Sequence, residues 1–138
     1  MSHESRIIFF QVTDVPTKLK RILETVKAHF KKKESLLFFV EDDRALHYLD
    51  ELLWKVPDTS FLPHAIANAS TEEKIVITKT KTNVNHSPFA FNLCSTPLLI
   101  PGFKVIYDFE DCSAPNKKNL SELRFNAYKQ AKILIECH

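Results

Sequence analysis

The stretch RIIFFQVTDVPTKLKRILETVKAHFKKKESLLFFVEDDRALHYLDELLW, residues 6–54, decides the fold. It contains two predominantly apolar runs without polar alternation, within residues 6–12 and 35–41, and such runs are typical of strands buried on both faces of a sheet. Each run leads into a segment with apolar residues at helical spacing, the first reaching about Phe30 and the second reaching Leu53. This alternation predicts a mostly parallel sheet covered by helices, and a chain of 138 residues suits a single α/β domain.

Polar residues mark the start of both predicted helices. Asp14 or Thr13 can cap the first helix, and Pro16 fits its first turn because the N–H at that position needs no partner. The acids at 41–43 close the second strand and open the second helix, whose dipole favours acids in its first turn. The first helix is also rich in lysine, so direct nucleic-acid binding is one hypothesis and a solvated helix face is the alternative.

The second half of the chain gives fewer clear signals. Residues 74–80 and 103–109 are predicted strands, because β-branched and aromatic residues concentrate there. A last helix is predicted from about Asn119, which forms a capping-box pattern with Glu122. Its apolar face is predicted to consist of Leu120, Leu123, Ala127, Ala131 and Leu134. The run at 89–93 lies among prolines, and no structure is assigned to it.

Composition excludes several classes of protein. One glycine, Gly102, is too few for a glycine-rich phosphate loop, so a dinucleotide-binding or P-loop enzyme is excluded. No two of the six histidines are three or four residues apart, and the three cysteines form no Cys-x-x-Cys pair, so we expect no metal, no cofactor and no disulfide. The apolar runs are too short to span a membrane and no signal segment opens the chain, so a cytoplasmic protein is expected.

Three carboxylates follow the first two predicted strands: Asp14, Glu41 and Asp42. Open α/β sheets bind their ligands at the carboxyl ends of the strands. One hypothesis is therefore a small Mg²⁺-dependent phosphotransfer or nucleotide-processing enzyme that uses these three residues. Helix capping explains the same residues, because caps occupy the same positions.

The last predicted helix carries a second pattern. Arg124, Tyr128 and Lys132 recur every four residues, beside Phe125 and Lys129, and are predicted to lie away from the apolar face. An aromatic surface flanked by cations suits an acidic peptide with an apolar end, because the rings bury the apolar group while the cations hold carboxylates. The alternative is an ordinary solvated helix face.

The stretch LDELLWKVPDTSFLPH, residues 49–64, is the most distinctive part of the chain. It holds the only tryptophan, a phenylalanine and two prolines where a predicted helix meets a loop. Prolines stiffen that loop, and preorganised aromatic residues are typical anchors of protein interfaces. Packing of Trp54 in the core explains the same residues.

This stretch resembles the chi subunit of bacterial DNA polymerase III, through the pattern LDE-x-LW-x-x-P-x-x-SF-x-PH preceded by Glu41-Asp42. The resemblance extends more weakly from the first strand to the RFNAYK segment at 124–129. It implies one three-layer α/β/α Rossmann-like domain over residues 1–138 that has no chemistry of its own. It also implies that DNA is contacted only indirectly, through other proteins.

The resemblance implies two partners. The psi subunit of the clamp loader would bind Asp50, Leu53, Trp54, Pro57, Phe61, Pro63 and His64. The acidic, phenylalanine-ended C-terminal tail of single-stranded DNA-binding protein, called the tail below, would bind Arg124, Phe125, Tyr128, Lys129 and Lys132. The family's last helix is more basic, with a tyrosine-lysine pair where this chain has Phe125-Asn126, so Lys117 and Lys118 are further candidates for holding the tail.

Overall fold

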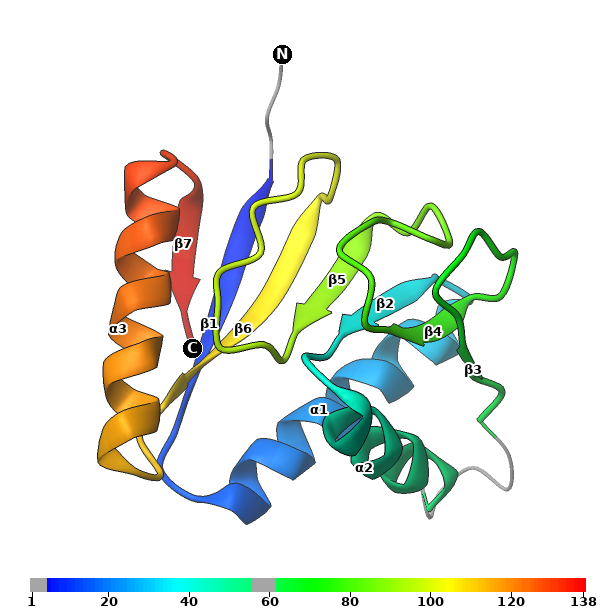
Figure 1. Cartoon of the computed structure of the whole chain (residues 1–138), viewed down its shortest axis with the longest axis horizontal. Coiled ribbons are helices and arrows are strands. Elements are labelled where there is room, and N and C mark those ends of the chain that lie inside the picture. Colours follow the sequence, from blue (N-terminus) through cyan, green and yellow to red (C-terminus); the bar gives the residue numbers. More distant parts are fainter. Residues whose placement is uncertain (1–4, 56–61) are drawn as a thin grey trace.

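The computed structural model describes residues 5–55 and 62–138. Its elements follow the chain in this order: β1 Arg6–Val12, α1 Val15–Lys31, β2 Leu36–Phe39, α2 Asp43–Trp54, β3 Ala65–Ile66, β4 Ile75–Thr78, β5 Phe89–Asn92, β6 Val105–Asp111, α3 Pro115–Gln130 and β7 Leu134–Cys137 (Figure 1). The strand–helix alternation predicted for residues 6–54 is confirmed. None of the described helices is both long enough and apolar enough to cross a membrane.

The strands form one seven-stranded sheet in the order β3-β4-β2-β5-β6-β1-β7. Every strand pair is parallel, so the prediction of a mostly parallel sheet is confirmed. β1 lies between β6 and β7, with Arg6 opposite Val105 on one side and Leu134 on the other. The first strand of the chain is therefore held by the last two.

The direction in which the chain crosses the sheet explains the three layers. From β1 to β2 to β3 it moves one way, and from β6 to β7 it moves the other way. Crossovers between parallel strands are right-handed, so opposite directions place the connecting helices on opposite faces. α1 and α2 accordingly lie together on one face, while α3 lies apart from them beside β1, β6 and β7 (Figure 1).

Each face of the sheet has its own apolar core. On the α1 and α2 face, Val26 and Leu49 pack with Phe38 and Phe91 of the strands. On the other face, α3 covers only part of the sheet, and the chain between β5 and β6 supplies Leu98 and Phe103 instead. A loop segment thus takes the place of a helix on that face.

The predicted starts of the first two helices are confirmed. Asp14 Oδ1 accepts a hydrogen bond from the Thr17 N–H at 2.8 Å, and Asp42 Oδ1 accepts one from the Ala45 N–H at 2.9 Å. Each such cap satisfies a backbone donor that the helix leaves without a partner, and it typically stabilises a protein by about 1 kcal/mol.

The prediction for the last helix is wrong in two respects. α3 begins at Pro115, after Ala114, whose side chain makes no capping bond, rather than near Asn119. Its faces are also exchanged: Leu123 is 65% exposed, whereas Arg124 is 6% and Tyr128 0% exposed. Leu134, expected on this helix, belongs to β7. The cause of the exchange is Asp108, a buried carboxylate of β6 that bonds to Arg124 and Tyr128.

Candidate functional site

A polar cavity of about 220 Å³ opens at the carboxyl ends of β2, β5 and β6. The chain leaves β2 toward one face of the sheet and leaves the neighbouring β5 toward the other, which is where open α/β sheets bind ligands. The charged residues of its lining are Lys18, Glu41, Asp108, Asp111, Lys117 and Arg124. Pockets for drug-sized ligands start at about 300 Å³, so this cavity suits a small charged group rather than a nucleotide.

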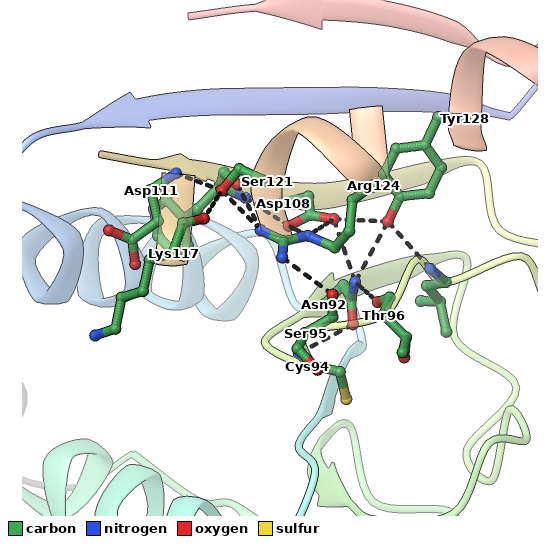
Figure 2. A network of polar contacts seen from close by, with 12 residues as sticks. Asn92, Cys94, Ser95, Thr96, Asp108, Asp111, Lys117, Ser121, Arg124 and Tyr128 are labelled. Carbon is green, nitrogen blue, oxygen red and sulfur yellow. Dashed lines mark hydrogen bonds and ion pairs between the residues drawn. The ribbon is translucent and has the colours of Figure 1, made fainter. Parts of the chain in front are cut away.

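Arg124 forms the base of this cavity, and Figure 2 shows its guanidinium directed at Asp108. Arg124 Nε lies 3.2 and 3.3 Å from the two carboxylate oxygens of Asp108. Nη2 donates to the Phe109 carbonyl at 2.8 Å, and Nη1 donates to the Ser95 carbonyl at 3.2 Å. Asp108 and Arg124 are 1% and 6% exposed, so this is a buried ion pair that joins α3 to β6 and to the chain after β5.

Tyr128, one helical turn further, completes the network (Figure 2). Its hydroxyl donates to Asp108 Oδ2 at 2.6 Å and accepts from the Leu98 N–H at 3.1 Å. Asn92 Nδ2 donates to the Thr96 carbonyl at 2.9 Å and lies 3.2 Å from Asp108 Oδ2. The segment 92–98 is therefore tied to the sheet and to α3 by buried hydrogen bonds.

The electrostatics of the site follow from burial and charge. Burial raises the pKa of the Asp108 carboxyl, and the Arg124 guanidinium opposes that rise. Burial and the Asp108 carboxylate both raise the pKa of Tyr128, so its hydroxyl keeps the proton that it donates. Partial burial also raises the pKa of Asp111, but hydrogen bonds from Ser113 and from Lys18, whose Nζ is 2.9 Å away, outweigh it and lower that pKa to about 2.

The residues predicted to bind the tail fall into two groups. Arg124 and Tyr128 are buried in the network, so their predicted exposure on a surface stripe is wrong. Lys129 and Lys132 are exposed. Phe125 is half-buried, and its ring centroid lies 5.7 Å from the ring centroid of Phe9. Lys129 Nζ lies 6.0 Å from the ring centroid of Phe125. The aromatic–cation contact expected on this helix thus exists at Phe125 and Lys129.

The residues predicted to bind psi lie at the end of α2 and before β3. His64 has a fully buried side chain, with Nε2 2.8 Å from Asp50 Oδ1 and Nδ1 2.9 Å from the Leu62 carbonyl. The Trp54 ring lies 4.6 Å from the His64 ring and is 55% exposed. Leu53 is a core residue at 1% exposure, and Pro63 is exposed. Pro57 and Phe61 lie outside the described residues.

The three carboxylates of the enzyme hypothesis do not form a site together. Asp14 and Asp42 cap α1 and α2, and Glu41 accepts from the Ser95 N–H at 2.5 Å and from the Ser95 hydroxyl. Within residues 5–55 and 62–138, no three His, Cys, Asp or Glu side chains are grouped as ligands of a metal ion. The prediction that these residues hold Mg²⁺ is wrong, and capping accounts for two of them.

Sequence reasoning missed Asp108, the residue on which the network depends. The signal was present, because VIYDFED places a carboxylate in the middle of a predicted buried strand. A buried carboxylate requires a cation or several hydrogen-bond donors. Arg124 and Tyr128, on the helix that follows this strand, supply both.

Members of the two predicted groups lie toward opposite edges of the sheet, although Arg124 and Tyr128 contact β6 in its interior. Trp54 and His64 flank the connection into β3, and Lys132 lies two residues before β7. β3 and β7 are the two edge strands of the sheet (Figure 1). The sheet order places six strand spacings between them. At about 4.8 Å per spacing, the two edges are about 29 Å apart.

The fold and the site define a three-layer α/β protein with a parallel sheet, in which the charged residues at the base of the cavity bond to one another. The family model described as DNA polymerase III chi subunit, HolC, matches residues 5–136. The chain therefore belongs to the chi family, which makes it an accessory subunit of the replicative polymerase and confirms the resemblance noted in its sequence. No curated protein matches the chain.

Proposed function

We propose that the chain is a non-catalytic replication adaptor that bridges the tail of single-stranded DNA-binding protein to the clamp loader through the psi subunit. It contacts DNA only through these partners. The observation that carries the proposal is the position of Trp54 and His64 toward one edge of the sheet and of Lys132 toward the other.

Support for the psi surface comes from the way Trp54 is held. The indole rests on the His64 ring, whose two nitrogens each lie within 2.9 Å of an acceptor, so its base is fixed. A half-exposed tryptophan on a fixed base loses little side-chain freedom on binding, and such residues dominate the energy of many protein interfaces.

Support for the tail surface comes from the exposed cations around the end of α3. Lys129 and Lys132 are both exposed, and Phe125 offers a half-buried ring beside Lys129. Arg124 and Tyr128 act in this proposal as positioning residues, because their polar atoms are already bonded to Asp108 and to the segment 92–98. Carboxylates of the tail would pair with the lysines, and its aromatic end would bury apolar surface.

The separation of the surfaces decides the mechanism. At about 29 Å, two modest interfaces do not compete for the same area. Binding of one partner then raises the local concentration of the other, which reaches the millimolar range for short flexible linkers. The adaptor needs no chemical step for this.

A paired titration tests the proposal. One ligand is the psi subunit, and the other is a synthetic acidic peptide that ends in Pro-Phe with a free carboxylate. We expect Trp54→Ala to weaken psi binding more than about 10-fold and to leave peptide binding unchanged. We expect Lys129→Ala, which removes one exposed cation, to weaken peptide binding up to about 5-fold and to leave psi binding unchanged. If saturation with psi abolished peptide binding, or if neither ligand bound at low salt, the adaptor role would be excluded.

A further inference from the structure

A second groove, of about 690 Å³, lies at the amino ends of β6 and β7, between the loop at 98–104 and the turn that joins α3 to β7. We call it the loop–turn groove. Leu98, Ile100 and Ile133 contribute to its apolar lining. Leu99, also part of the lining, is 52% exposed. The groove is about three times as large as the cavity at the carboxyl edge.

The charges of the loop–turn groove have one sign. Lys104 and Lys132 line it, and no aspartate or glutamate of the described chain does. The cavity at the carboxyl edge differs, because Glu41, Asp108 and Asp111 offset its cations. An apolar floor with two cations and no anion complements a short acidic peptide that has an apolar residue.

The walls of this groove are held before any ligand arrives. The Tyr128 hydroxyl accepts from the Leu98 N–H at 3.1 Å, and the Ser5 hydroxyl donates to the Phe103 carbonyl. Gly102 turns the loop with a φ of 103°, a conformation that L-residues rarely adopt. A groove formed in advance lowers the ordering cost of binding.

Lys132 occupies a backbone position where a side chain is unfavourable. It has a φ of 62° just after the end of α3, the position that helices most often fill with glycine. Lys33 has the same role after α1, with a φ of 59°. Glycine at either position should relieve strain equally, but only Lys132 lines the groove. The two lysines are therefore a matched pair for an experiment.

We propose that the loop–turn groove takes the apolar end of an acidic peptide, with Lys104 and Lys132 pairing with its carboxylates. This inference rests on the proposed function, because it gives the tail an apolar binding site that the predicted residues of α3 alone do not supply. It moves the centre of the tail site from the middle of α3 to the turn after it.

Calorimetric titration at low salt tests this binding site. The acidic peptide ending in Pro-Phe is titrated into the native chain, Lys132→Gly and Lys33→Gly. We expect Lys132→Gly to weaken binding about 5-fold and Lys33→Gly to leave it unchanged. Both variants should unfold at the same temperature as the native chain or higher, because glycine suits a positive φ. Leu99→Glu, at an exposed position, should weaken binding at least about 10-fold through repulsion and loss of apolar contact.

The outcomes separate the groove from the proposed function. If the native chain binds the peptide and Lys132→Gly and Leu99→Glu bind it equally well, the groove is excluded while tail binding stands. If Lys33→Gly weakens binding as much as Lys132→Gly, the effect is one of net charge, and the groove is again excluded. If the native chain binds no peptide, both the groove and the tail-binding role are excluded.

Discussion

Replacing Arg124 with leucine should destabilise the protein far more than an ordinary change on a helix. Leucine keeps much of the side-chain volume, but it removes the cation beside Asp108, which is 1% exposed. Breaking a buried ion pair by removing one partner typically costs about 3–5 kcal/mol, because the remaining charge is left buried without compensation. The carbonyls of Phe109 and Ser95 lose their donors as well.

The expected change in melting temperature follows from chain length. For a chain of this size, 1 kcal/mol corresponds to about 3 °C, so Arg124→Leu should lower the melting temperature by about 10–15 °C. Urea unfolding followed by circular dichroism measures the same loss as a free energy. Lys118→Leu is the matched control, since it changes an exposed cation of the same helix and should alter stability by less than about 0.5 kcal/mol.

A double-mutant cycle isolates the ion pair. Asp108→Asn combined with Arg124→Leu should be more stable than Arg124→Leu alone, because no buried charge remains. Burial raises the pKa of Asp108 in the folded state above its value in the unfolded chain. The free energy of unfolding is therefore highest below the unfolded pKa, and it decreases as pH rises through the folded pKa. The deficit of Arg124→Leu should therefore shrink as pH falls toward 4. A melting temperature within about 2 °C of the native value would refute the buried pair.

Three further predictions concern single side chains. Tyr128→Phe removes the hydroxyl between Asp108 and the Leu98 N–H. We expect the free energy of unfolding to fall by about 1–3 kcal/mol and the Leu98 amide to exchange its hydrogen faster. An unchanged exchange rate would contradict the role given to Tyr128. The pKa of Asp111 is lowered from 3.8 to about 2, which corresponds to about 2.4 kcal/mol, and solvent screening reduces the expected contribution to about 1 kcal/mol. That contribution should be complete above pH 4 and vanish as pH falls to about 2, so urea titrations of Asp111→Asn and the native chain should converge there. Burial lowers the pKa of His29 from 6.5, so the free energy of unfolding of the native chain should fall as pH drops below 6.5. If a His29→Gln variant lost stability with falling pH as steeply as the native chain, His29 would not be the cause of this pH dependence.

The burial of Arg124 decides how an alanine scan of the last helix is to be interpreted. A loss of tail binding in an Arg124 variant would not by itself locate a contact, because the variant disturbs the segment 92–98 through Ser95. Lys129 and Lys132 are better probes, since both are exposed. The stability of each variant has to be measured beside its affinity.

The first half of the fold could be predicted because each element there carries a local signal. Two apolar runs of strand length, an aspartate before each helix and a proline in the first turn of α1 all agree with the observed elements. The order of the strands could not be predicted, since it depends on contacts between distant segments. β5, among prolines at 88 and 97, lies at the middle of the sheet between β2 and β6.

The candidate site could be predicted only in part, because charge was equated with exposure. Arg124 and Tyr128 were assigned to the surface, yet Asp108 draws both into the interior by pairing with them. Leu123, an apolar residue, is exposed in their place. The end of α3 has no glycine or proline to mark it, since Lys132 adopts the left-handed conformation itself. The apolar pattern therefore predicts a helix that continues to Leu134, which belongs to β7.

The position of β1 between β6 and β7 has a consequence for synthesis on the ribosome. Arg6 faces Val105 and Leu134, so the earliest strand to emerge has no partner until the last quarter of the chain follows it. At about 5–20 residues per second, that interval is on the order of ten seconds. Throughout it the apolar run RIIFFQV is a nascent segment without a sheet to join, and the domain can close only once its C-terminal strands are released.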